Sequence, residues 1–111
     1  MWIEEMPRQD CADLLARNQL ARLACAKDDQ PYVTPLFFAS YAEALYSFST
    51  VGQKIAWMRA NPLVCVEADE VTNPQEWKSV VVFGRYEELP DTPGYEAERE
   101  LAHSLLERRP I

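Results

Sequence analysis

Short runs of β-branched and aromatic residues follow one another along most of the chain, and turn-forming residues separate them. Such runs are typical of strands in an antiparallel sheet, because Val, Thr, Tyr and Phe favour extended backbone. The segment 27–31, Lys-Asp-Asp-Gln-Pro, separates the first two runs and has the composition of a turn, so it predicts a hairpin. The strand-like runs span residues 20–26, 32–39, 45–49, 63–68 and 79–89.

Helical periodicity occurs in three further segments. Asp10 is placed to cap the first helix, and Ile55 and Met58 fall on one side of the second, which must end before Pro62. Pro93, preceded by Thr, is suited to the start of the third. The predicted helices span residues 11–18, 53–61 and 94–109.

Strands and helices that are segregated in this way are typical of an α+β protein that is mainly β, built on an antiparallel sheet or a small barrel. Neither a linker rich in Gly and Ser nor an internal repeat interrupts the sequence. We therefore expect a single domain over residues 1–111.

Composition excludes several classes of protein. The 11 basic and 18 acidic residues give a net charge of -7, which opposes nucleic-acid binding, and the apolar stretches are far shorter than the ~20 residues that cross a membrane. Cys11, Cys25 and Cys65 fit neither a disulfide framework nor zinc-ligand spacing. We expect a cytoplasmic protein with reduced thiols, no metal site, no membrane partner and no nucleic-acid partner.

The residue types that usually perform acid, base or nucleophilic catalysis form no recognisable constellation. His103, the one histidine, lies in a polar helix and is expected at the surface, while Cys25 and Cys65 lie in apolar strands where inert thiols are the norm. The acidic pairs 69–70 and 87–88 fall at predicted strand ends, where solvated carboxylates are common. No catalytic residue is assigned from the sequence.

The stretch 48–54, Phe-Ser-Thr-Val-Gly-Gln-Lys, joins a predicted strand to a predicted helix and has chemistry that suits a phosphate group. Ser49 and Thr50 offer hydroxyls, Gly52 permits close backbone approach, and Lys54 lies in the first helical turn near free N–H groups. The spacing is not that of a Walker loop. The alternative is that a hydroxyl only caps the helix and Lys54 points to solvent.

Pro35 interrupts an apolar run and cannot complete a sheet ladder. It predicts an edge strand, a bulge, or a strand whose polar groups serve a ligand such as the rim of a heterocycle. Trp57 and Trp77 are more often core or interface residues than cofactor-stacking ones.

In their order and spacing, these features resemble the FMN-binding split-barrel superfamily related to pyridoxamine 5'-phosphate oxidase, most closely its nitroimidazole-resistance-like branch. The matching segments are ARLA at 21–24, PYVTPL at 31–36, LYSFST at 45–50, GQK at 52–54, the helix ending in NP at 61–62 with VCVE at 64–67, and VVVFGR at 80–85.

The resemblance implies a six-stranded antiparallel split β-barrel of Greek-key topology with short flanking helices, which forms a homodimer and holds FMN at the subunit interface. It implies that the strand at 33–36 runs along the isoalloxazine, that Lys54 and the two hydroxyls before it contact the phosphate, that Ser79 approaches the ring, and that Trp77 walls the site. The implied cofactor-binding residues are Val33, Thr34, Pro35, Leu36, Ser49, Thr50, Lys54, Trp77 and Ser79.

The sequence also departs from pyridoxamine phosphate oxidase itself. Val33 and Phe38 stand where further basic residues bind the phosphate in that oxidase, and Ile55 follows Lys54. We also expect no counterpart of the segment that supplies substrate contacts after the last helix. Oxidation of vitamin B6 is therefore not expected. We expect an FMN-dependent oxidoreductase acting on a small organic compound, for which a nitro compound is one candidate. The alternative is a binding or regulatory module that does not turn over flavin and is empty or holds haem or a deazaflavin.

Overall fold

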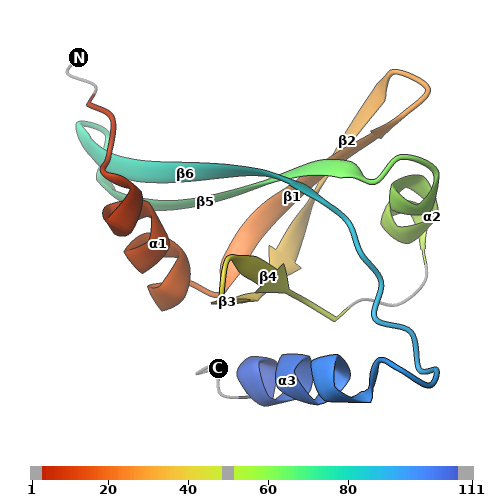
Figure 1. Ribbon diagram of the computed structural model, residues 1–111. Coiled ribbons are helices and arrows are strands. Elements are labelled where there is room, and N and C mark those ends of the chain that lie inside the picture. The colour runs from red at the N-terminus through yellow and green to blue at the C-terminus, as the bar shows by residue number, and fades with distance from the viewer. Residues whose placement is uncertain (1–3, 49–51, 108–111) are drawn as a thin grey trace.

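The computed structural model describes residues 4–48 and 52–107, and in them the chain forms mainly antiparallel strands with three helices (Figure 1). This confirms a mainly β protein of the α+β class. In chain order the elements are α1 (Arg8–Arg17), β1 (Leu20–Lys27), β2 (Gln30–Phe37), β3 (Ala39–Tyr41), β4 (Ala44–Tyr46), α2 (Gln53–Ala60), β5 (Leu63–Asn73), β6 (Glu76–Arg85) and α3 (Glu96–Glu107).

The strands form two antiparallel sheets. The larger has the order β2-β1-β5-β6, and the smaller contains β3 and β4. Over the described residues these two sheets do not join into one closed barrel, so the closure expected from the resemblance stays a prediction.

Two tight turns fix the register of the hairpins. Asp28 and Asp29 both have positive φ, at 50° and 64°, and connect Lys27 directly to Gln30. Ala42 and Glu43 do the same between β3 and β4, with φ of 49° and 64°. Positive φ at both central residues gives a turn whose twist matches that of the strands. The predicted first hairpin is confirmed.

One face of the large sheet is covered by the rest of the chain. Helix α1 packs on β5 and β6, α2 packs on β1, and β3 with β4 contacts α1 and α3. Phe38 and Leu14 are fully buried beneath the sheet. The other buried apolar residues of this core are Ala21, Leu23, Cys25, Leu36, Ile55, Met58, Val66, Ala68 and Val80.

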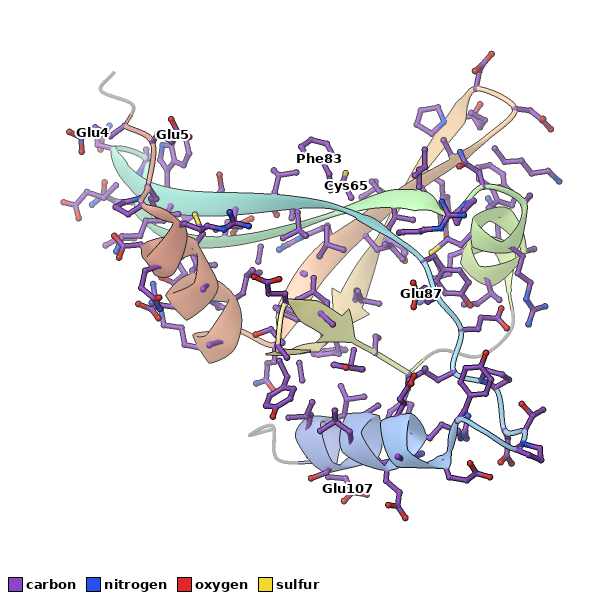
Figure 2. The ribbon with its side chains drawn as sticks, viewed as in Figure 1. Glu4, Glu5, Cys65, Phe83, Glu87 and Glu107 are labelled. Atoms are coloured by element: carbon purple, nitrogen blue, oxygen red, sulfur yellow. The ribbon has the colours of Figure 1, made fainter. Side chains whose placement is uncertain are left out.

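The opposite face of the large sheet, which we call the open face, carries the alternate residues of the same strands. Figure 2 shows Phe83 and Cys65 on the side away from β3, β4 and α3. Phe83 is 84% exposed and Val33 is 63% exposed. The other large exposed apolar residues that share this face by register are Leu20, Phe37, Leu63, Val71, Trp77 and Val81.

Several predicted strand boundaries were wrong. Strand β5 extends to Asn73, because all of its second half is paired with β6, and only a short turn remains of the loop predicted at 72–76. The strand predicted at 32–39 is divided into β2 and β3 at the buried Phe38. The strand predicted at 45–49 is the shorter β4, and position 49 lies outside the described residues.

The helix starts also differ from the prediction. Helix α1 begins after Pro7, whose carbonyl accepts the N–H of Cys11, so Asp10 lies in the first turn and is not the cap. Helix α3 begins at Glu96, because Gly94 adopts a φ of 101° and donates its N–H to the Glu96 carboxylate. None of the described helices has the length and apolar character needed to span a membrane.

Candidate functional site

Helix α2 places Lys54 in its first turn, where the sequence predicts a phosphate contact. Lys54 is half-buried, and the helix is fixed from below by the buried side chains of Ile55 and Met58. The ring of Trp57 packs against Tyr32 of β2, with centroids 5.7 Å apart. The N-terminus of α2 is therefore held at a defined position relative to β2.

The end of α2 is tied down by polar contacts. The Asn61 side chain donates to the carbonyl of Ala26 at 3.1 Å. Arg59 forms an ion pair with Glu88, which also accepts the hydroxyl hydrogen of Tyr86 at 2.8 Å. Arg59 and Tyr86 lower the pKa of the Glu88 carboxyl, and burial together with Glu88 raises the pKa of Tyr86 to about 12.

Ser49 and Thr50, the predicted phosphate hydroxyls, lie outside the described residues. The residue before them, Phe48, has its ring 4.5 Å from that of His103 on α3. His103 is exposed, as predicted, and the contact shows that α3 lies beside the start of this stretch.

The predicted ring-contacting strand is β2, an edge strand of the large sheet. Its pleat separates the four residues: Val33 and Pro35 are exposed on the open face, whereas Thr34 is half-buried and Leu36 is buried on the covered face. The edge position predicted by Pro35 is confirmed. The Leu36 side chain therefore does not face a ligand on the open face.

Trp77 and Ser79 lie on β6, the opposite edge of the same sheet. Ser79 is half-buried, Trp77 is 42% exposed, and both belong to the open face. Strands β1 and β5 separate them from β2, a width of roughly 14 Å at the usual strand spacing. One chain therefore presents the predicted ring contacts as two halves and does not bring them together.

A shallow hollow of about 370 Å³ lies at the β5–β6 hairpin, and of the predicted residues it contains only Trp77. Its lining also includes Glu70, Glu76 and Lys78. In residues 4–48 and 52–107, no three His, Cys, Asp or Glu side chains are grouped to hold a metal ion. Neither this hollow nor a second one beside α1, lined by Met6, Asp10, Asp13, Arg17 and Lys78, is lined by Val33, Pro35 or Lys54.

A cluster of charged residues that the sequence reading missed lies on the open face. Arg22 of β1 is opposite Glu67 of β5 and 3.8 Å from the Asp69 carboxylate. Burial raises the pKa of Glu67, and a hydrogen bond with Asp69 adds to this, whereas Arg22 lowers it. Asp69 was interpreted as a solvated strand-end carboxylate, but β5 continues to Asn73. The alternation of Glu67 and Asp69 with apolar neighbours along β5 was the sequence signal that could have predicted this cluster.

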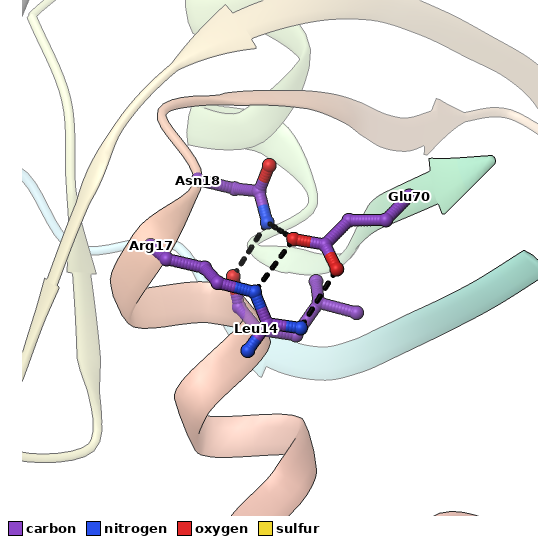
Figure 3. Close-up of polar contacts among 4 residues, drawn as sticks. All are labelled: Leu14, Arg17, Asn18 and Glu70. Carbon is purple, nitrogen blue, oxygen red and sulfur yellow. Dashed lines mark hydrogen bonds and ion pairs between the residues drawn. The ribbon is translucent and has the colours of Figure 1, made fainter. Parts of the chain in front are cut away.

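Glu70 is the next residue on β5, and its side chain points to the covered side. Figure 3 shows both of its oxygens accepting hydrogen bonds from Arg17 at 2.7 Å, with a third from Asn18, also at 2.7 Å. Asn18 donates as well to the carbonyl of Leu14 at the end of α1. These donors hold the pKa of Glu70 at about 2 and tie α1 to β5.

Comparison with known proteins places this arrangement of antiparallel sheets and flanking helices in a family. The sequence profile of the pyridoxamine 5'-phosphate oxidase family matches residues 7–110, nearly the whole chain. The chain belongs to this family.

Individual relatives agree with the assignment. An uncharacterised protein of Rhizobium meliloti is 50% identical over 110 residues, which are 99% of this chain and 73% of that protein. A crystal structure of an FAD-binding protein from Mesorhizobium loti is 51% identical, with a TM-score of 0.84 over 93% of this chain and 75% of that one. A putative pyridoxamine 5'-phosphate oxidase from Corynebacterium glutamicum is 27% identical, with a TM-score of 0.75 over 90% and 75%.

Proposed function

We propose that the protein binds a flavin nucleotide between two copies of the chain and acts as a flavin-dependent oxidoreductase on a small organic compound. Membership of the pyridoxamine 5'-phosphate oxidase family and the 51% identity to an FAD-binding protein support the flavin. The observation that carries the proposal is that Val33, Pro35, Trp77 and Ser79 all lie on one open sheet face.

The chemistry of the open face fits a flavin ring. An isoalloxazine is flat and apolar over most of its surface and polar along one edge. Val33 and Pro35 offer an apolar wall, and β2 has a hydrogen-bonded neighbour in the described sheet only on its β1 side. The outward backbone groups of β2 that precede Phe37, whose carbonyl accepts the Ser47 hydroxyl, are therefore suited to the polar rim of the ring.

The phosphate end of the flavin fits the start of α2. Lys54 and the N–H groups of the first turn both favour a dianion, and the hydroxyls of Ser49 and Thr50 remain predicted partners. FMN is the smallest ligand that satisfies these contacts. FAD contains the same unit with an adenylate attached, and the Mesorhizobium relative is described as binding it.

We infer a second copy of the chain because the predicted ring contacts on β2 and on β6 lie at opposite edges of the sheet. A cofactor site normally surrounds most of its ligand, but a single open sheet face supplies one wall. An isologous dimer across this face would cover the exposed apolar side chains and bring β2 of one copy toward β6 of the other. Closure of the six strands into a Greek-key split barrel belongs to the same proposal.

The flavin would supply the electron-transfer chemistry, while residues of the chain bind it, orient it and exclude water. Pyridoxamine phosphate is not the proposed substrate. Val33 and Phe38 stand at the positions where basic residues are expected in that oxidase, and Phe38 is fully buried and cannot reach a phosphate.

The test is titration of FMN, FAD and riboflavin with purified protein, followed by flavin fluorescence, together with an absorption spectrum of the protein as isolated. We expect binding of FMN or FAD, and no binding at tens of micromolar would contradict the proposal. A haem or deazaflavin spectrum would favour the binding-module alternative, as would bound flavin that no reductant and acceptor pair can cycle.

The role of Lys54 is tested in the same titration. Lys54→Ala should weaken FMN binding about 10- to 30-fold, the loss expected for one charge-assisted hydrogen bond, and leave riboflavin unchanged. Lys78→Ala, which removes a charge from the far end of the sheet, is the control. Equal losses for FMN and riboflavin would remove Lys54 from the phosphate site.

A further inference from the structure

The centre of the open face carries the one cluster of charges found there, Arg22, Glu67 and Asp69, among the described residues. The three lie on the two middle strands of the sheet. Pro35 and Val81 flank Arg22 and Glu67 in one row, and Asp69 lies in the next row opposite Ser79. The large exposed apolar side chains lie around this cluster, toward the strand ends and on the edge strands. A partner that covers the apolar residues must also cover the charges.

The mixed charge of the cluster favours a second copy of the chain as that partner. The cluster contains one guanidinium and two carboxylates, so it is complementary to itself when turned by a two-fold axis. The cluster of each copy nevertheless has one carboxylate more than it has guanidinium groups, and Arg85, the other cation on this face among the described residues, lies opposite Leu63, away from Glu67. Covering a carboxylate that lacks a matching cation is unfavourable, and protonation removes that cost.

Glu67 is the group placed to take up the proton. Its neighbours on the open face are Arg22 from β1 and, from β5 itself, Asp69 and Cys65. Strand β6 contributes only Val81, Ser79 and Phe83 beside it, and Arg85 lies further along that strand. A protonated Glu67 can donate its hydrogen to Asp69, while Arg22 stays paired with the Asp69 carboxylate.

We propose that docking of a second copy on the open face takes up a proton from solvent at Glu67, so that the dimer forms more tightly at low pH than at high pH. The inference rests on the homodimer proposed above. Burial and Asp69 already raise the pKa of Glu67 in the single chain, and further burial in the dimer raises it again. Association is therefore strongest below the pKa of the free chain and weakens as the pH rises toward the pKa in the dimer.

The experiment is sedimentation velocity on the full chain between pH 5.5 and 8.0 at constant ionic strength. For the wild-type protein we expect the dimer Kd to rise at least tenfold over this range, and by up to about a hundredfold per pH unit where both Glu67 groups titrate. Glu67→Gln, which mimics the protonated side chain, should keep Kd constant within about threefold.

Glu87→Gln is the matched control, because it removes the same charge from an exposed position after β6. It should retain the wild-type pH dependence, and an equal flattening in both variants would show that only net charge matters and would overturn the proposal. A wild-type dimer with a flat Kd would overturn the proton uptake and leave the homodimer intact. A chain that stays monomeric at every pH would overturn both.

A second measurement uses the wild-type protein alone. The heat of dimer dissociation on dilution, compared in phosphate and Tris buffers, gives the number of protons released. Proton release that reaches one to two per dimer between pH 5.5 and 8.0 supports the proposal, and release of none over this range contradicts it.

Discussion

The two faces of the large sheet carry similar amounts of apolar side chain but have different surroundings. On one face Leu23, Val66 and Val80 are buried by helices and by β3 and β4. On the other face Val33, Leu63 and Phe83 are exposed, although the opposite face of the same strands carries the buried Leu36, Val66 and Val80.

The apolar side chains on both faces indicate that the large sheet is suited to burial on both sides. An antiparallel sheet with one solvated face normally carries polar residues there, and large exposed apolar patches mark interaction sites. The chain covers the first face itself, and the proposed dimer would cover the second. The predicted flavin contacts lie on that second face, so cofactor binding and assembly are linked in the proposed dimer.

The largest expected effect comes from the covered face. Phe38→Ala should lower the free energy of unfolding by about 3–5 kcal/mol, because it removes a fully buried aromatic ring and leaves a cavity. Urea denaturation at pH 7 measures this loss. A loss below about 1.5 kcal/mol would mean that the covered face is not the principal core.

The same substitution on the open face should act on assembly. Phe83→Ala removes an equal side chain that is 84% exposed in the single chain. We expect the dimer Kd to rise about 10- to 30-fold, as for a central aromatic contact, and flavin affinity to fall with it. Analytical ultracentrifugation measures the first effect. Unchanged association would show that the dimer, if present, uses another surface.

The smallest expected effect concerns the covered-side carboxylate Glu70. Glu70→Gln should lower the free energy of unfolding by about 1 kcal/mol at pH 7, a modest value because the contact with Arg17 is partly exposed. The pKa of Glu70 in the folded chain is about 2, below its ordinary value, so its contribution is present above about pH 4.5 and is lost as the pH falls toward 2.

Urea unfolding at several pH values measures the contribution of Glu70, with Glu76→Gln in the hairpin as the control. The difference between wild type and Glu70→Gln should narrow at low pH. A difference that stays constant down to pH 2.5 would contradict the assignment. Glu67 and Glu70 also distinguish the two faces of β5. The pKa of Glu67 on the open face is raised above its ordinary value, whereas the pKa of Glu70 on the covered face is lowered.

Much of the fold could be predicted from local sequence. The strand-like composition of 79–89 marked most of β6, and the turn composition of 27–31 marked the first hairpin. The length of β5 could not be predicted, because Asp69, Glu70 and Asn73 disfavour strands on their own. They extend the strand only because β6 pairs with them and because distant arginines, Arg22 and Arg17, neutralise the carboxylates.

The candidate site was predicted as a set of residues but not as a geometry. The pleat of β2 separates Thr34 and Leu36 from Val33 and Pro35, and strand order places Trp77 and Ser79 at the far edge. Neither follows from residue types alone, since strand order depends on long-range pairing. The open face links the β2 and β6 halves of the predicted site. It can be recognised only in the tertiary structure, where the helices cover the other face of the sheet.

The most direct test of the central claim is sedimentation velocity of the flavin-loaded protein with detection at the flavin absorption band. We predict that bound flavin sediments with a species of about 25.6 kDa, twice the chain mass of 12.8 kDa, and that Phe83→Ala shifts flavin to the free fraction as the dimer dissociates. Flavin that sediments at full occupancy with a 12.8 kDa species would contradict a site completed by a second copy.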